Sequence, residues 1–151
     1  MLYKNIMLAI DGSEASNAAV QEALKLIKDQ DVHLRIIHIA DESVFHVGGP
    51  SFDYPLLIAE LKQQGQGILD AAASTIESQS SIKVEKSLLE MKLLQGGVAE
   101  LIIEEAKDWP TDLLILGTHG RRGFSRLFLG SVAENIIRIA TMPVLLVHAP
   151  K

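Results

Sequence analysis

The stretch GTHGRRGFSRLFLGS at residues 117–131 decides the fold of this chain. The apolar run LLIL at 113–116 precedes it, and an amphipathic stretch at 132–140 follows it. This order predicts a buried strand, a glycine-rich loop and the start of a helix. In such a unit the glycines have no Cβ, so the backbone N–H groups can approach a phosphate chain closely.

Several features of this stretch suit an anionic ligand. A helix that begins near Ser131 would carry unpaired N–H groups and a partial positive charge in its first turn. Arg121, Arg122 and Arg126 add positive charge within the loop. In the alternative interpretation, the glycines only turn the chain and the arginines are solvated at the surface.

The spacing of the glycines separates this loop from two common phosphate loops. A Walker loop requires a lysine before its hydroxyl residue, and no lysine precedes Ser131. A Rossmann fingerprint requires G-x-G-x-x-G, which Gly117, Gly120 and Gly123 do not match. The pattern Gly117-x2-Gly120-x9-Gly130-Ser131 instead resembles the ATP-binding motif G-x2-G-x9-G-[ST] of the universal stress protein family.

The composition narrows the class of protein. The chain has 151 residues, which suits one domain, and its hydrophobic content of 48% and charged content of 22% are ordinary for a globular protein. The net charge of −5 argues against a general binder of nucleic acid or anionic membranes, because such proteins need a broad basic face.

The lack of cysteine excludes disulfides and thiolate metal sites. There is no leader pattern, and no apolar run approaches the roughly 18 residues of a membrane span, so we expect a soluble, cytoplasmic protein.

Hydrophobic periodicity predicts alternating strands and helices along the chain. We expect strands at 6–10, 32–40, 82–88, 112–116 and 144–147, helices near 13–27, 55–78, 98–109 and 131–140, and a loop at 41–53. This alternation predicts one α/β domain over residues 1–151, with a five-stranded parallel sheet and helices on both faces.

The resemblance to the universal stress protein family covers nearly the whole chain. The segments similar to the family are KNIMLAIDGS at 4–13, IHI at 37–39, DLLILGTHG at 112–120 and MPVLLV at 142–147. This resemblance implies a Rossmann-like fold of the adenine nucleotide alpha hydrolase-like type, with strand order 3-2-1-4-5. In such a sheet the order reverses between strands 1 and 4, and ligands bind at the carboxyl ends of the strands at that point.

The resemblance also implies a set of nucleotide-binding residues, with the acidic residue after the first strand beside the ribose. The implied residues are Ala9, Ile10, Asp11, Ile39, Leu116, Gly117, His119, Gly120, Arg121, Gly130, Ser131 and Val132. Because every motif position is kept, we expect the ATP-binding subgroup, with ATP as the ligand and Mg²⁺ held by the phosphates rather than by protein side chains. Whether residues 45–55 fold over the nucleotide as a lid stays open.

Some of the polar residues also have a purely structural interpretation. Asp11 could serve only as a turn and capping residue, and His119 could be an ordinary surface histidine. His33 and His38 lie on a predicted strand without a carboxylate cluster or H-x-x-x-H spacing, so we expect structural roles for both. We expect Trp109 to pack at a helix end.

Two classes of function fit such a nucleotide site, a regulatory module and an enzyme that cleaves ATP or adenylates an acceptor. Hydrolysis requires a base or water-orienting residue and a carboxylate-held Mg²⁺, but residues 117–133 contain no Asp, Glu, Asn or Gln. The adenylating motif S-G-G-x-D-S does not occur either, since DGSEAS stands at 11–16. We therefore expect an ATP-binding stress-response regulator. The alternatives are a slow ATP hydrolase and a dimeric scaffold that uses no nucleotide.

The last predicted strand suggests assembly into a homodimer. In the family order the fifth strand lies at a sheet edge, and VLLV at 144–147 has neither a charge nor a break to protect that edge. Two such strands related by a two-fold axis would cover each other, so we expect a homodimer through residues 143–148. The alternative is a solvated edge. The sequence identifies neither a regulatory partner nor the stress that is sensed.

Overall fold

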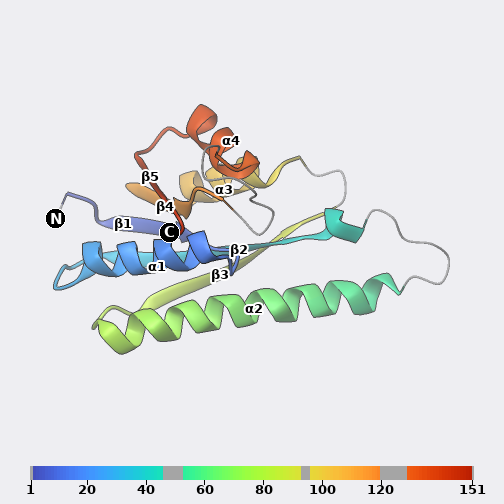
Figure 1. Cartoon of the computed structure of the whole chain (residues 1–151), viewed down its shortest axis with the longest axis horizontal. Helices are drawn as coiled ribbons and strands as arrows, with labels where there is room; N and C mark the ends of the chain where they lie inside the picture. Colours follow the sequence, from blue (N-terminus) through green and yellow to red (C-terminus); the bar gives the residue numbers. More distant parts are fainter. Residues whose placement is uncertain (1, 46–52, 93–95, 120–128, 151) are drawn as a thin grey trace.

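The computed structural model describes residues 2–45, 53–92, 96–119 and 129–150 (Figure 1). Strands and helices alternate along the chain, as the hydrophobic pattern predicts. The elements are β1 (Asn5–Ala9), α1 (Glu14–Ile27), β2 (His33–Asp41), the 3₁₀ helix η1 (Glu42–Phe45), α2 (Tyr54–Gln79), β3 (Val84–Met91), α3 (Val98–Asp108), β4 (Leu113–Gly117), α4 (Ser131–Ile139) and β5 (Val144–Val147).

The sheet has five parallel strands in the order β3-β2-β1-β4-β5, which confirms the expected topology. The first strand occupies the centre, and its last residue, Ala9, lies opposite Ile37 of β2 and Leu116 of β4. The order therefore reverses between β1 and β4, and the carboxyl ends of these two strands are neighbours. A crevice for a ligand forms at such a reversal in parallel sheets.

Helices cover both faces of the sheet. Figure 1 shows α1 and α2 on one side and α3 and α4 on the other. Ile6 and Leu8 of β1 pack with residues of α1 and α2, whereas Met7 between them packs with residues of α3 and α4, and all three are fully buried. Helices cover both faces of β1, so neither face needs polar side chains, and this explains the continuous apolar run of the strand.

Two parts of the chain differ from the sequence-based expectation. The third strand begins at Val84 and continues to Met91, because β2 runs on to Asp41 and pairs with β3 over its whole length. Residues 42–45 form η1 where a loop was expected, and the Asp41 side chain starts this turn by accepting a hydrogen bond of 2.9 Å from the Ser43 N–H. The bounds of β3 and η1 are determined by strand pairing and by a hydrogen bond in the turn, rather than by the spacing of apolar residues.

Polar contacts attach α2 to the sheet and to η1. The Lys86 ammonium of β3 lies 2.8 Å from the Asp70 carboxylate of α2, and this hydrogen bond lowers the pKa of Asp70. At the other end of α2, the Tyr54 hydroxyl donates a 2.7 Å hydrogen bond to the Phe45 carbonyl. That bond ties the start of α2 to the end of η1.

His38, His33 and Trp109 occupy the structural positions expected of them. His38 is 8% exposed, and its Nδ1 lies 2.8 Å from the Ile10 carbonyl oxygen, whereas His33 is exposed at the start of β2. Trp109 follows the last residue of α3, and the guanidinium of Arg35 lies 4.8 Å from its ring centroid. In the part of the chain that the structure describes, no helix combines the length and apolar character needed to cross a membrane.

We predict that Gly117→Ala destabilises the fold, because β4 ends in direct contact with the start of α1. A Cβ at this position would lie 2.8 Å from both the carbonyl carbon and the Cβ of Ala15, and backbone atoms cannot move aside at low cost. We expect the free energy of unfolding, measured in urea, to fall by about 1–3 kcal/mol, as for other overpacked sites.

Gly67→Ala is the matched control, since a Cβ there would meet no atom within 4 Å and the residue lies within α2. Replacing glycine inside a helix should raise the free energy of unfolding by about 0.5–1 kcal/mol. An unchanged stability for Gly117→Ala would show that α1 is not held against β4 at this point.

Candidate functional site

The turn after β1 and the start of the glycine-rich loop lie against each other at the carboxyl edge of the sheet. The Ser13 hydroxyl donates a 3.4 Å hydrogen bond to the His119 carbonyl oxygen, although the two residues are 106 positions apart in the sequence. This contact brings together the two segments that the motif and the resemblance assign to one site.

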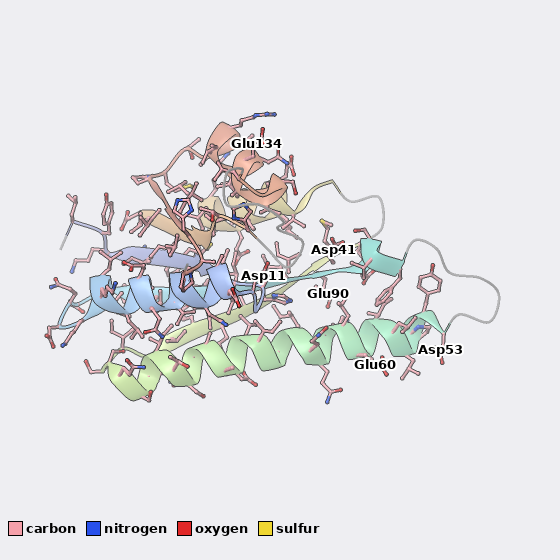
Figure 2. All side chains as sticks on the ribbon, in the orientation of Figure 1. Asp11, Asp41, Asp53, Glu60, Glu90 and Glu134 are labelled. Carbon is pink, nitrogen blue, oxygen red and sulfur yellow. The ribbon has the colours of Figure 1, made fainter. Side chains whose placement is uncertain are left out.

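Asp11 is fixed by the turn that joins β1 to α1. Its Oδ1 accepts a 2.9 Å hydrogen bond from the Ser13 N–H, and its own N–H donates to the Ser16 hydroxyl at 3.1 Å. Gly12 between them has φ of +81°, a conformation that a side chain would disfavour. Figure 2 shows Asp11 beside the first turn of α1. The turn role is therefore present, and it is compatible with a ligand contact because a carboxylate has two oxygens.

Thr118 connects the two ends of the glycine-rich loop. Its N–H donates to the Val147 carbonyl oxygen at 2.9 Å, and its carbonyl oxygen accepts from the Gly130 N–H at 2.8 Å. The residue is 1% exposed. The main chain leaving β4 is therefore held beside Gly130, the residue that precedes α4. Sequence reasoning missed this residue, and its only signal was a hydroxyl between two motif positions.

The N-terminus of α4 has no side-chain cap among the described residues. Gly130 is its N-cap, whereas Ser13 caps α1 by accepting from the Ser16 N–H and Asp53 caps α2 by accepting from the Leu56 N–H. The first N–H groups of a helix have no intrahelical acceptor. Among the residues that the structure describes, no side chain occupies these donors at α4, and the helix dipole favours negative charge there.

Apolar residues from three elements adjoin this helix start. Ala9, Ile39 and Val132 are partly buried and pack against the hydrophobic cluster under α3 and α4, in which Leu116 is 4% exposed. The side chain of Ile10 behaves differently, because it belongs to the cluster on the opposite face, under α1. Only the main chain of Ile10 can border a ligand on the α3 and α4 side.

His119 begins the glycine-rich loop and is half-buried. Its Nδ1 lies 3.0 Å from the Thr118 hydroxyl oxygen. Its Nε2 is buried and has no hydrogen-bond partner among the described residues. A buried polar atom without a partner is costly, by about 1–3 kcal/mol, and is a reason to look for a ligand.

The structure describes some of the other predicted positions but not all of them. Gly117 ends β4 and Ser131 is exposed at the first position of α4. Gly120 and Arg121, together with residues 46–52 of the possible lid at 45–55, lie outside the described residues. Within the described ranges, no group of three or more metal-ligating side chains could hold a metal ion. The site thus presents an acidic turn, an apolar patch and an uncapped helix start along one edge.

Comparisons with known proteins give a consistent result. The model of the universal stress protein family matches residues 2–148. The chain is 38% identical to universal stress protein MJ0531 of Methanocaldococcus jannaschii, covering 99% of this chain and 85% of the relative. It is 32% identical to universal stress protein A homolog 1 of Coxiella burnetii, covering 97% of each.

Solved structures agree with these relatives in fold. Protein MJ0577 of Methanocaldococcus jannaschii superposes with a TM-score of 0.81 at 24% identity, covering 100% of this chain and 99% of that one. A universal stress protein family member from Burkholderia pseudomallei gives 0.77 at 27% identity, covering 97% and 96%. The family model matches residues 2–148, and a relative is 38% identical over 99% of this chain, so the chain belongs to the universal stress protein family.

Proposed function

We propose that this protein is an ATP-binding stress-response regulator that holds the nucleotide at the carboxyl ends of β1 and β4. The observation that carries the proposal is the start of α4, where an uncapped helix N-terminus is tied to Thr118 beside the β1 turn. This arrangement offers main-chain donors to phosphate oxygens at the point of the sheet where ligands bind.

The phosphates, the ribose and the adenine would each contact different residues at the carboxyl edge of the sheet. The phosphates would lie at Gly130, Ser131 and the loop that contains His119, with Gly120 and Arg121 as further contacts of the motif. The ribose would lie beside Asp11, whose carboxylate can accept hydrogen bonds from hydroxyl groups. The adenine would cover the partly buried patch of Ala9, Ile39 and Val132, bordered by Leu116, Gly117 and the main chain of Ile10.

Two structures with a similar fold support an adenine nucleotide as the ligand class. One is a universal stress protein in complex with cAMP, 22% identical with a TM-score of 0.69. The other is the Archaeoglobus fulgidus protein in complex with dAMP, 22% identical with a TM-score of 0.64. The choice of ATP rests on the spacing of Gly117, Gly120, Gly130 and Ser131. Mg²⁺ would be coordinated by the phosphates, since the motif supplies no carboxylate.

Regulation by binding fits the chemistry of the loop better than fast catalysis. Residues 117–133 contain no Asp, Glu, Asn or Gln, so His119 is the only group there that could orient or deprotonate a water. The protein would act in the cytoplasm through a partner whose affinity differs between the ATP-bound and free forms.

We predict that Mg·ATP raises the thermal stability of the protein. A ligand at about 100 times its dissociation constant adds about 2.7 kcal/mol to the free energy of unfolding. Gly130→Val should fold and lose the shift, because a branched side chain would occupy the space of the phosphates. Gly67→Ala should keep it. No shift for ligand-free wild-type protein at millimolar Mg·ATP would refute nucleotide binding and favour the scaffold alternative.

We predict that hydrolysis of ATP is slow. With no carboxylate or amide in the loop, phosphate release should stay well below about 1 per second, the lower end of ordinary enzyme rates. A colorimetric phosphate assay under saturating ATP measures this directly. Turnover at ordinary enzyme rates would make the protein an ATPase, and an unchanged rate in His119→Ala would remove that residue from the chemistry.

We also propose a homodimer through residues 143–148. β5 lies at the edge of the sheet, and Val144, Leu145 and Leu146 are all partly exposed. Uncovered apolar edge strands are templates for pairing, and two antiparallel β5 strands about a two-fold axis would protect each other. The same edge is the basis of the alternative function, a dimeric scaffold without nucleotide.

We predict a dimer at micromolar concentration by light scattering behind size exclusion. Leu146→Lys should shift it toward a monomer, because a charge would be buried against the second copy. Leu56→Lys is the control, since Leu56 is 54% exposed in the first turn of α2, away from β5. ATP binding should survive in both variants. A monomeric wild-type protein would contradict the proposed assembly.

A further inference from the structure

The hydroxyl of Thr118 lies between two imidazole rings. Its Oγ1 is 3.0 Å from Nδ1 of His119 and 3.4 Å from Nδ1 of His148, the residue that follows β5. Thr118 is 1% exposed, so this oxygen is shielded from water. The three side chains form a short hydrogen-bonded chain from the end of β5 to the glycine-rich loop.

The number of protons in this chain restricts the tautomers of the two rings. A hydroxyl has one proton to donate, and a neutral imidazole has one N–H and one bare nitrogen. When Thr118 donates to one Nδ1, the other ring must donate its own Nδ1–H to the hydroxyl oxygen. In that arrangement His119 and His148 take opposite tautomers, and a proton on Nδ1 of His148 places the proton of His119 on Nε2.

The tautomer of His119 decides what its buried Nε2 can bind. This nitrogen has no hydrogen-bond partner among the described residues, and it belongs to the loop that would surround the phosphates. An anionic oxygen can be bound there only if Nε2 carries a proton. His148 can hold its own proton on Nδ1, because its side chain is exposed and water can donate to its bare Nε2.

We propose that His148 is a positioning residue for ligand binding, which acts through Thr118 to keep a proton on Nε2 of His119. His148 donates its Nδ1–H to the Thr118 hydroxyl, which in turn donates to Nδ1 of His119. The Nε2–H of His119 then faces a phosphate oxygen of the bound nucleotide. This inference rests on the proposed function, and its hydrogen-bonded chain can be tested without any nucleotide.

The first test is the tautomer of each histidine in ligand-free protein. Long-range ¹H–¹⁵N correlation spectra of ¹⁵N-histidine-labelled protein report it at a pH well above the usual histidine pKa of about 6.5. We expect the Nε2–H tautomer for His119 and the Nδ1–H tautomer for His148 in the wild type, and loss of that arrangement in Thr118→Val, which removes the hydroxyl. A proton on Nδ1 of His119 would overturn the proposal, and so would two Nε2–H tautomers in the wild type.

The second test is the affinity for Mg·ATP, measured by calorimetry. His148→Phe removes the donor, and we expect the affinity to fall roughly five- to tenfold, the size of one ordinary hydrogen bond. His148→Asn should bind Mg·ATP with an affinity within about twofold of the wild type, because an amide N–H can take the place of Nδ1–H. His33→Ala, at an exposed histidine at the start of β2, should change nothing.

The outcomes separate this inference from the proposed function. Normal ATP affinity in His148→Phe would refute the role of His148 and leave nucleotide binding intact. No ATP binding by the wild type would refute the proposed function, while the tautomers in ligand-free protein would still decide whether Thr118 couples the two rings.

Discussion

The candidate site depends on how one buried residue, Thr118, is hydrogen-bonded. Its N–H joins β4 to β5, its carbonyl oxygen holds Gly130, the N-cap of α4, and its hydroxyl contacts two histidines. The main-chain bonds determine where the helix start lies relative to the sheet. The neighbouring Gly117 allows β4 to end against Ala15 of α1, so the acidic turn after β1 is held at the same edge. Thr118 and Gly117 therefore bring the start of α4 and the turn after β1 to the same edge of the sheet.

A site of this kind recognises its ligand mainly through the main chain. The donors at the start of α4 are backbone N–H groups, which are present whatever the side chains are, provided no Cβ blocks the approach. This explains why the motif consists of glycines and a single hydroxyl residue. A net charge of −5 is compatible with such a site, since the partial positive charge of a helix N-terminus acts over a short range.

The sequence predicted the fold well, because the deciding patterns are local. Apolar runs gave the strands, helical spacing gave the helices, and the resemblance supplied the order of the strands. The glycine spacing also pointed to the loop and to α4. The features that the sequence did not predict depend on contacts between residues that are far apart in the sequence. The bond between Ser13 and His119 joins residues 106 positions apart, and the contact of Thr118 with His148 crosses from β4 to β5. Neither residue type nor spacing reveals such a pair. The same is true of β3, whose end at Met91 is determined by pairing with Asp41.

The bond between the Tyr54 hydroxyl and the Phe45 carbonyl has a consequence for how this chain can vary in length. It brings the two ends of the intervening segment together. For a segment whose ends are already joined, added length costs little, since each doubling of a flexible loop adds only about 0.6 kcal/mol of closure entropy. The stretch between Phe45 and Tyr54 is therefore a place where evolution, or a protein engineer, can lengthen the chain at low cost to the sheet.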